Sequence, residues 1–136
     1  MSPLAPAVLV FEKTPRWESE LKRRMSRAPF LVRPCRSAAD VLHLSRQMPG
    51  SVVVIDFAAG AAEGLRLLEA LDRRRLRALA VVVASTALQE LEWPARELGA
   101  AGFVAETIGG AALAALCRRI LTAASPALSP AGPAPG

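Results

Sequence analysis

The sequence is poor in the residues that many catalytic and binding sites depend on. It contains no tyrosine, one histidine and two cysteines, and aromatic residues make up 4% of its 136 residues. We read the lone His43 as a surface residue within a helix, which leaves no Ser/His/Asp arrangement for hydrolysis. Cys35 and Cys117 form neither a CxxC pair nor a metal-ligand spacing, so reduced, buried thiols are expected.

Long apolar runs are also missing. No run approaches the ~18 residues that a membrane-spanning helix needs. Residues 1–6 lack a basic segment followed by an apolar one, so we expect no signal peptide and a cytoplasmic protein without a membrane partner. The net charge of +5 is scattered over several helices, and few aromatics are present to stack on bases. We therefore do not expect nucleic-acid binding.

Short apolar runs alternate with helical patterns along the chain. Five runs, each bounded by polar or turn residues, predict buried strands over residues 7–11, 29–33, 51–55, 78–83 and 102–105.

The helix signals fall between these runs. Thr14-Pro15 predicts a helix with proline at its first position, and Ser37 with Asp40 predicts the capped start of the next. Further helices are expected around residues 65–71 and after Gly109-Gly110. Pro94 predicts a short, irregular element over residues 88–98.

This order predicts an α/β fold. Continuous apolar strands are typical of a parallel sheet covered on both faces, and five β-α repeats give a three-layer, doubly wound (βα)5 domain. We assign residues 1–124 to this domain. Residues 125–136 are rich in proline, alanine and glycine and are predicted to be a disordered tail.

In such folds, ligands gather beyond the carboxyl ends of the strands. The polar residues that follow the predicted strands are therefore the candidate site. They are Glu12, Lys13, Asp56, Ser85, Thr86 and Glu106.

Two segments resemble the receiver domains of response regulators. Val54-Ile55-Asp56, followed by a loop to Gly64 and Leu65-Arg66-Leu67-Leu68, resembles their phosphoacceptor segment. Residues 97–104 resemble the junction between their fourth helix and last strand. The likeness spans residues 7 to about 123 and implies a CheY-like, flavodoxin-type sheet with strand order 2-1-3-4-5. It also implies a non-enzymatic module of two-component phosphorelay signalling.

The resemblance implies a role for each pocket residue. Asp56 matches the phosphoacceptor, and Thr86 or Ser85 matches the hydroxyl that contacts the phosphoryl group. Glu12 and Asp56 would hold Mg²⁺ if the pocket is competent, and no other cofactor is expected. Lys13, however, stands where the family has a second acid, and Glu106 stands where it has a lysine.

These two departures have opposite charge and suggest a degenerate member, or pseudo-receiver. We hypothesise that the Lys13 ammonium lies among Asp56, Glu12 and Glu106 and replaces both the metal and the missing lysine. A lysine there would weaken Mg²⁺ binding. Structural roles stay open: Asp56 could cap its loop, Thr86 could cap a helix, and Glu106 could be a solvated acid.

Three functions follow. The first is an atypical receiver that acts through protein contacts, with Trp93, Phe103 and the last helix as a partner face or homodimer interface. The second is a conventional stand-alone receiver, phosphorylated on Asp56 by a histidine kinase. The third is a flavodoxin-like, flavin-binding module, although residues 12–16 do not form the Ser/Thr/Gly-rich phosphate loop that it needs.

Overall fold

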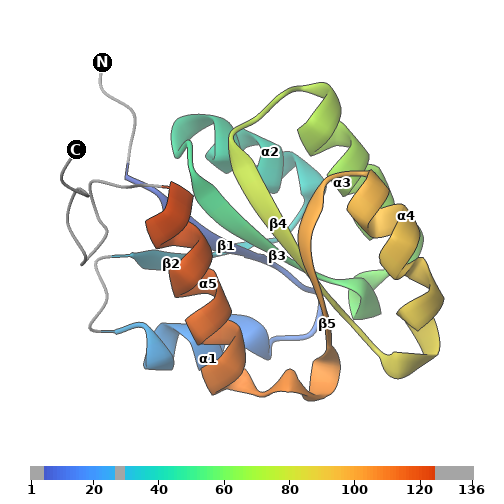
Figure 1. The fold of residues 1–136 in the computed structure, drawn as a ribbon. Helices are drawn as coiled ribbons and strands as arrows, with labels where there is room; N and C mark the ends of the chain where they lie inside the picture. Colours follow the sequence, from blue (N-terminus) through green and yellow to red (C-terminus); the bar gives the residue numbers. More distant parts are fainter. Residues whose placement is uncertain (1–4, 27–29, 125–136) are drawn as a thin grey trace, which may run out of the picture.

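Five parallel strands form one sheet at the centre of the molecule (Figure 1). The computed structural model describes residues 5–26 and 30–124. The strand order is β2-β1-β3-β4-β5, as predicted. The strands are β1 (Ala7–Phe11), β2 (Leu31–Cys35), β3 (Ser51–Asp56), β4 (Ala78–Ala84) and β5 (Ala100–Ala105).

Helices cover both faces of the sheet (Figure 1). The side chains of α1 and α5 pack on one face, and those of α2 and α3, together with α4, pack on the other. The helices are α1 (Trp17–Arg24), α2 (Ala38–Gln47), α3 (Ala61–Arg73), α4 (Glu92–Glu97) and α5 (Gly110–Ala124). Short 3-10 turns, η1 (Phe57–Ala59), η2 (Thr86–Leu91) and η3 (Glu106–Ile108), follow the last three strands.

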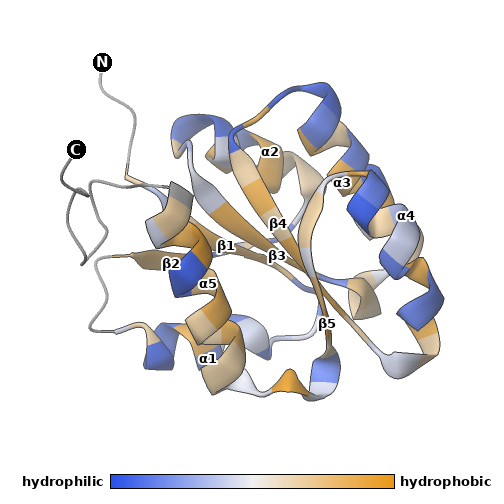
Figure 2. Ribbon diagram, in the orientation of Figure 1, coloured by the Kyte–Doolittle hydropathy of each residue, from blue (hydrophilic) through white to orange (hydrophobic). Residues whose placement is uncertain are grey.

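The inner strands β1 and β3 are buried along their whole length, which explains their continuous apolar sequences. Successive side chains of a strand point to opposite faces. Leu9 and Val53 therefore join the core under α2 and α3, whereas Val10 and Val54 join the core under α1 and α5. Figure 2 shows the hydrophobic strands between helices with polar outer faces.

Four predicted boundaries were wrong by two residues or more. The third helix, expected from about residue 65, begins at Ala61. The second strand runs to Cys35, because Pro34 is tolerated in β2, an edge strand that pairs only with β1. The first helix begins at Trp17 and not at Pro15, because the Glu12 carboxylate binds the backbone N–H groups of residues 16–18. The last strand begins at Ala100, ahead of an irregularity in its pairing with β4.

The irregular element around Pro94 consists of η2 and α4. Pro94 is the third residue of α4, where a missing N–H breaks no intrahelical hydrogen bond. The predicted tail, residues 125–136, and Pro29 of the predicted second strand lie outside the described residues. Among the helices that the structure describes, none is long and apolar enough to cross a bilayer.

Candidate functional site

The carboxyl edge of the sheet brings the predicted site residues together from neighbouring strands. Glu12 follows β1, Asp56 ends β3 and Ser85 follows β4, and these three strands are adjacent in the order β1-β3-β4. Glu106 begins η3, directly after the edge strand β5. The fold thus places a carboxylate, Asp56, between an acid on one side and a hydroxyl on the other.

Asp56 caps the short turn that follows its own strand. Its Oδ1 accepts a hydrogen bond from the Ala58 N–H at 2.9 Å, and the residue is 9% exposed. Gly60, with φ of 132°, then redirects the chain into α3. One oxygen of the candidate phosphoacceptor is therefore engaged in local structure.

Glu12 holds the start of α1. Its Oε1 accepts hydrogen bonds from the N–H groups of Arg16 at 3.1 Å and Trp17 at 2.9 Å. Its Oε2 accepts from the Glu18 N–H at 3.0 Å. The first N–H groups of a helix have no intrahelical partner, so a carboxylate here accepts their hydrogen bonds. Its negative charge also interacts favourably with the positive end of the helix dipole. Both oxygens of Glu12 are in use.

Lys13 forms an ion pair with Glu63, whose carboxylate lies 3.6 Å from the Lys13 ammonium. The prediction that Lys13 lies among Asp56, Glu12 and Glu106 was therefore wrong. Among the described residues, Lys13 forms its ion pair with Glu63. Glu63 lies in the first turn of α3, within the stretch up to Gly64 that was expected to be a loop. A helix that follows β3 begins at the same edge as Asp56, and this was the signal that could have identified Glu63.

A second cation, Arg16, joins two loops of this edge. Its Nη2 donates to the carbonyl oxygen of Glu106 at 2.7 Å, and its Cζ lies 4.1 Å from the centre of the Trp17 ring. The Glu106 backbone, and not its side chain, thus contacts the opposite loop. Sequence reasoning missed Arg16, which lies in no recognisable motif.

The two candidate hydroxyls are free of side-chain hydrogen bonds to the described residues. Ser85 is half-buried and Thr86 is exposed, and neither side chain caps η2. Both line a small pocket with Gln89, Glu92 and Phe103. The hydroxyls are therefore available to a ligand, although no basic side chain lines the same pocket.

The side chains at this edge do not make the oxygen cage that Mg²⁺ prefers. The oxygens of Glu12 already accept three backbone N–H groups, and Asp56 Oδ1 accepts a fourth. Lys13, which follows Glu12, supplies an ammonium and no oxygen ligand. Within residues 5–26 and 30–124, no group of three or more His, Cys, Asp or Glu side chains could hold a metal ion.

The remaining reactive side chains lie elsewhere. Burial raises the pKa of the Cys35 and Cys117 thiols to about 12, which keeps them protonated. His43 is exposed on α2, as expected.

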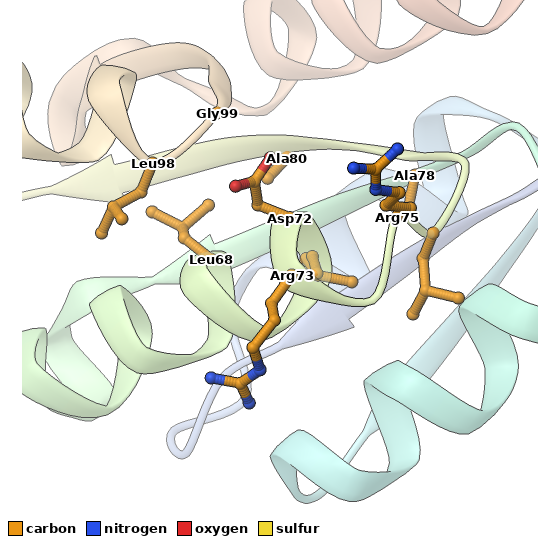
Figure 3. Close-up of a pocket in the computed structure, with 10 residues that line it drawn as sticks. Leu68, Asp72, Arg73, Arg75, Ala78, Ala80, Leu98 and Gly99 are labelled. Atoms are coloured by element: carbon orange, nitrogen blue, oxygen red, sulfur yellow. The ribbon is translucent and has the colours of Figure 1, made fainter.

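A separate hollow lies at the opposite edge of the sheet, where α3 ends and β4 begins (Figure 3). Leucine side chains, including Leu68 and Leu98, line it together with Asp72, Arg73 and Arg75. None of the predicted site residues reaches it.

The expected partner face is only partly available. Trp93 is 71% exposed on α4, which makes it the most exposed large hydrophobic residue in the described part of the chain. Phe103 packs edge-to-face against Phe57, with ring centres 6.1 Å apart. Trp93 is therefore free to contact a partner, whereas Phe103 mainly supports the core beneath it.

Comparison with known proteins places this fold among receiver domains. The signal receiver domain of a candidate Luxo repressor protein from Vibrio parahaemolyticus has a TM-score of 0.77 at 15% identity, over 91% of this chain and 95% of that one. A CheY-like response regulator receiver domain protein from Methanospirillum hungatei has a TM-score of 0.74 at 15% sequence identity, and the match covers 91% of this chain and 99% of that one. A response regulator from Thermotoga maritima has a TM-score of 0.72 at 16% sequence identity, and the match covers 88% of this chain and 99% of that one.

No family model matches the sequence, and no curated protein matches it. The structural likeness shows that the chain has the fold of response-regulator receiver domains, as the sequence resemblance implied.

Proposed function

We propose that the chain is a receiver-like signalling module that acts through protein contacts and not through phosphorylation of Asp56. In this proposal it is a pseudo-receiver, it is not an enzyme, and it needs no metal. The observation that supports the proposal is the use of Glu12: its two oxygens accept three backbone N–H groups at the start of α1.

Phosphoryl transfer to a carboxylate needs cations, because the donor and the nucleophile are both anionic. The ammonium of Lys13 is paired with Glu63, and the guanidinium of Arg16 is engaged by the Glu106 carbonyl and the Trp17 ring. Glu106, which begins η3 after the edge strand β5, adds a negative charge at the same edge of the sheet. With both cations engaged, we expect the repulsion between Asp56 and an anionic phosphoryl donor to stay unbalanced.

The decisive experiment treats the protein with Mg²⁺ and acetyl phosphate and reads its intact mass. We expect no phosphate-sized gain. Asp56→Ala and Asp72→Ala are measured beside it, and a conventional receiver domain in the same tube shows that the reagent is active. A gain that Asp56→Ala abolishes and Asp72→Ala keeps would establish the conventional receiver and overturn the proposal.

The proposed contact surface centres on Trp93. An exposed aromatic anchor contributes strongly to binding when a partner removes it from water. α4 and β5 pack together beneath this surface, so it is also the place for a homodimer. Sedimentation of the wild-type protein and Trp93→Ala over a concentration series tests the homodimer, with Leu31→Ala as the control because Leu31 is 64% exposed on the far edge strand. Association that is weakened only in Trp93→Ala supports this surface.

A further inference from the structure

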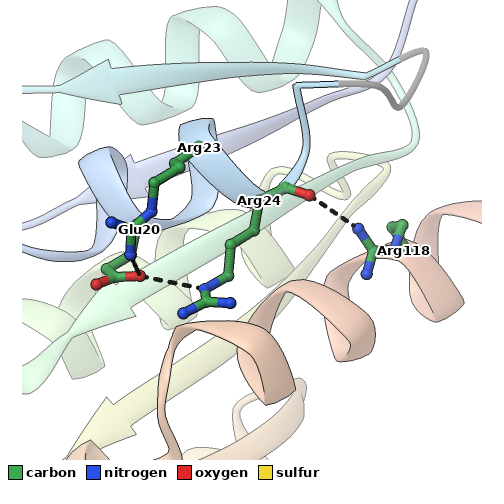
Figure 4. A network of polar contacts seen from close by, with 4 residues as sticks. All are labelled: Glu20, Arg23, Arg24 and Arg118. Carbon is green, nitrogen blue, oxygen red and sulfur yellow. Dashed lines mark hydrogen bonds and ion pairs between the residues drawn. The ribbon is translucent and has the colours of Figure 1, made fainter.

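A second charged surface lies away from Asp56, along the seam between α1 and α5 (Figure 4). The Glu20 carboxylate accepts hydrogen bonds from Arg23 Nη2 at 2.8 Å and from Arg24 Nε at 3.2 Å. From the other helix, Arg118 Nη1 donates to the Arg24 carbonyl oxygen at 3.3 Å. Arg23, Arg24 and Arg118 line one shallow groove together with Ala111. We call this the arginine seam.

The arginine seam carries more basic than acidic side chains. The other ion pairs in residues 5–26 and 30–124 join one base to one acid, such as Arg73 to Glu69 and Arg96 to Glu92. Here a single carboxylate serves two arginines, and Arg118 has no acid among its described partners. Three guanidinium groups and one carboxylate leave a local charge of 3 − 1 = +2.

The Glu20 carboxylate lies close to the start of α5. Gly110 at the start of α5 lies so close to Glu20 that a Cβ on Gly110 would collide with the Glu20 carboxylate. Glu20 therefore lies against the start of α5 and forms ion pairs with Arg23 and Arg24. The remaining N–H groups of the three arginines, those not donated to Glu20 or to the Arg24 carbonyl, bind no other residue in the described part of the chain.

We propose that the arginine seam is a binding site for a small phosphate-bearing anion. A phosphate monoester or a diphosphate matches the +2 charge, and the planar fork of a guanidinium fits phosphate oxygens in pairs. The adjoining pocket shares Arg23 and continues toward Gly109 and Gly110, which gives room for a second phosphate group. This site is independent of Asp56 and does not rest on the proposed function.

Calorimetric titration with inorganic pyrophosphate, at fixed ionic strength, tests the site. The double variant Arg23→Gln/Arg118→Gln should bind at least about tenfold more weakly than the wild type, because it removes two charge-assisted contacts. The matched control is Arg73→Gln/Arg96→Gln, which removes the same charge from other helices and should change affinity by less than about twofold. Asp56→Ala should bind as the wild type does.

A second measurement needs no variant. In the wild-type protein, pyrophosphate should shift the amide NMR signals of Arg23, Arg24, Ala111 and Arg118 more than those of other residues. Equal weakening in both double variants, or shifts spread evenly over the basic helices, would reduce the effect to net charge and overturn the site. A glutamate peptide of equal charge that binds as tightly as pyrophosphate would overturn the phosphate assignment and point to an acidic protein segment.

Discussion

The role of Glu12 is decided by the groups that its carboxylate contacts. A carboxylate after the first strand of a receiver fold is read from sequence as a metal ligand, yet this one accepts three backbone N–H groups. The same contacts explain why α1 starts two residues later than the sequence predicts. The identity of Glu12 could be read from the chain, whereas its role could not, because its N–H partners lie four to six residues away in a loop of irregular geometry.

Glu12→Ala should destabilise the protein by about 1–2 kcal/mol, because it leaves three N–H groups at the start of α1 without their acceptor. Urea unfolding measures the change. Glu90→Ala is the control: Glu90 is exposed and has no hydrogen-bond or ion-pair partner among the described residues, so its loss should change stability by less than ~0.5 kcal/mol. Equal effects of the two substitutions would refute the capping role.

The two thiols should be inert while the protein is folded. Burial raises the pKa of Cys35 and Cys117 to about 12, and the thiolate is the nucleophile that alkylating reagents need. At pH 8, iodoacetamide should label the native protein at least about 100-fold more slowly than the protein in urea. Intact mass after timed quenching counts the labels, and rapid native labelling would show that the thiols are accessible.

At the scale of elements, burial decides what could be predicted. The runs of β1, β3 and β4 are buried on both faces, so composition alone located them within a residue. The edge strands β2 and β5 were each misplaced by two residues, because Pro34 and an irregular pairing register interrupt their patterns. The helix α4 is short, and Pro94 in its first turn hid it among turn residues.

A matched pair of glycine substitutions tests the close contact between α3 and the turn after β3. In Gly64→Ala the new Cβ would lie 2.5 Å from Phe57 Cε1, and Phe57 is itself fixed against Phe103. We expect a loss of about 1–3 kcal/mol from overpacking. In Gly102→Ala the Cβ would meet Val81 at 3.6 Å, an ordinary contact, so the loss should be smaller. Thermal unfolding of both variants measures the difference, and a larger loss in Gly102→Ala would contradict this packing.

At the scale of the whole molecule, topology predicted which residues meet but not how they pair. The order of strands placed Glu12, Asp56 and Ser85 at one edge before any contact was known. Lys13 was expected to face Asp56 and instead pairs with Glu63, because the first turn of α3 brings that acid within reach of the exposed lysine side chain. The arginine seam escaped the sequence analysis for a related reason: Arg24 and Arg118 are separated by 94 residues and meet only once both helices pack on the sheet.

The two ion pairs of the arginine seam lie within the first helix, and they should make the stability of the protein depend on pH. Hydrogen bonds from Arg24 and Arg23 lower the pKa of Glu20 below its ordinary value. A carboxyl whose pKa is lowered by folding stabilises the native state at pH values above its unfolded pKa, about 4.3. That contribution is lost as the pH falls through the lower, folded pKa. The wild type should therefore exceed Glu20→Gln in urea midpoint at pH 7, by a small margin because Glu20 is solvated, and the margin should close toward pH 3. Glu90→Gln should show no such trend, and a margin that stays constant or widens on acidification would show that Glu20 acts through its shape and not through its charge.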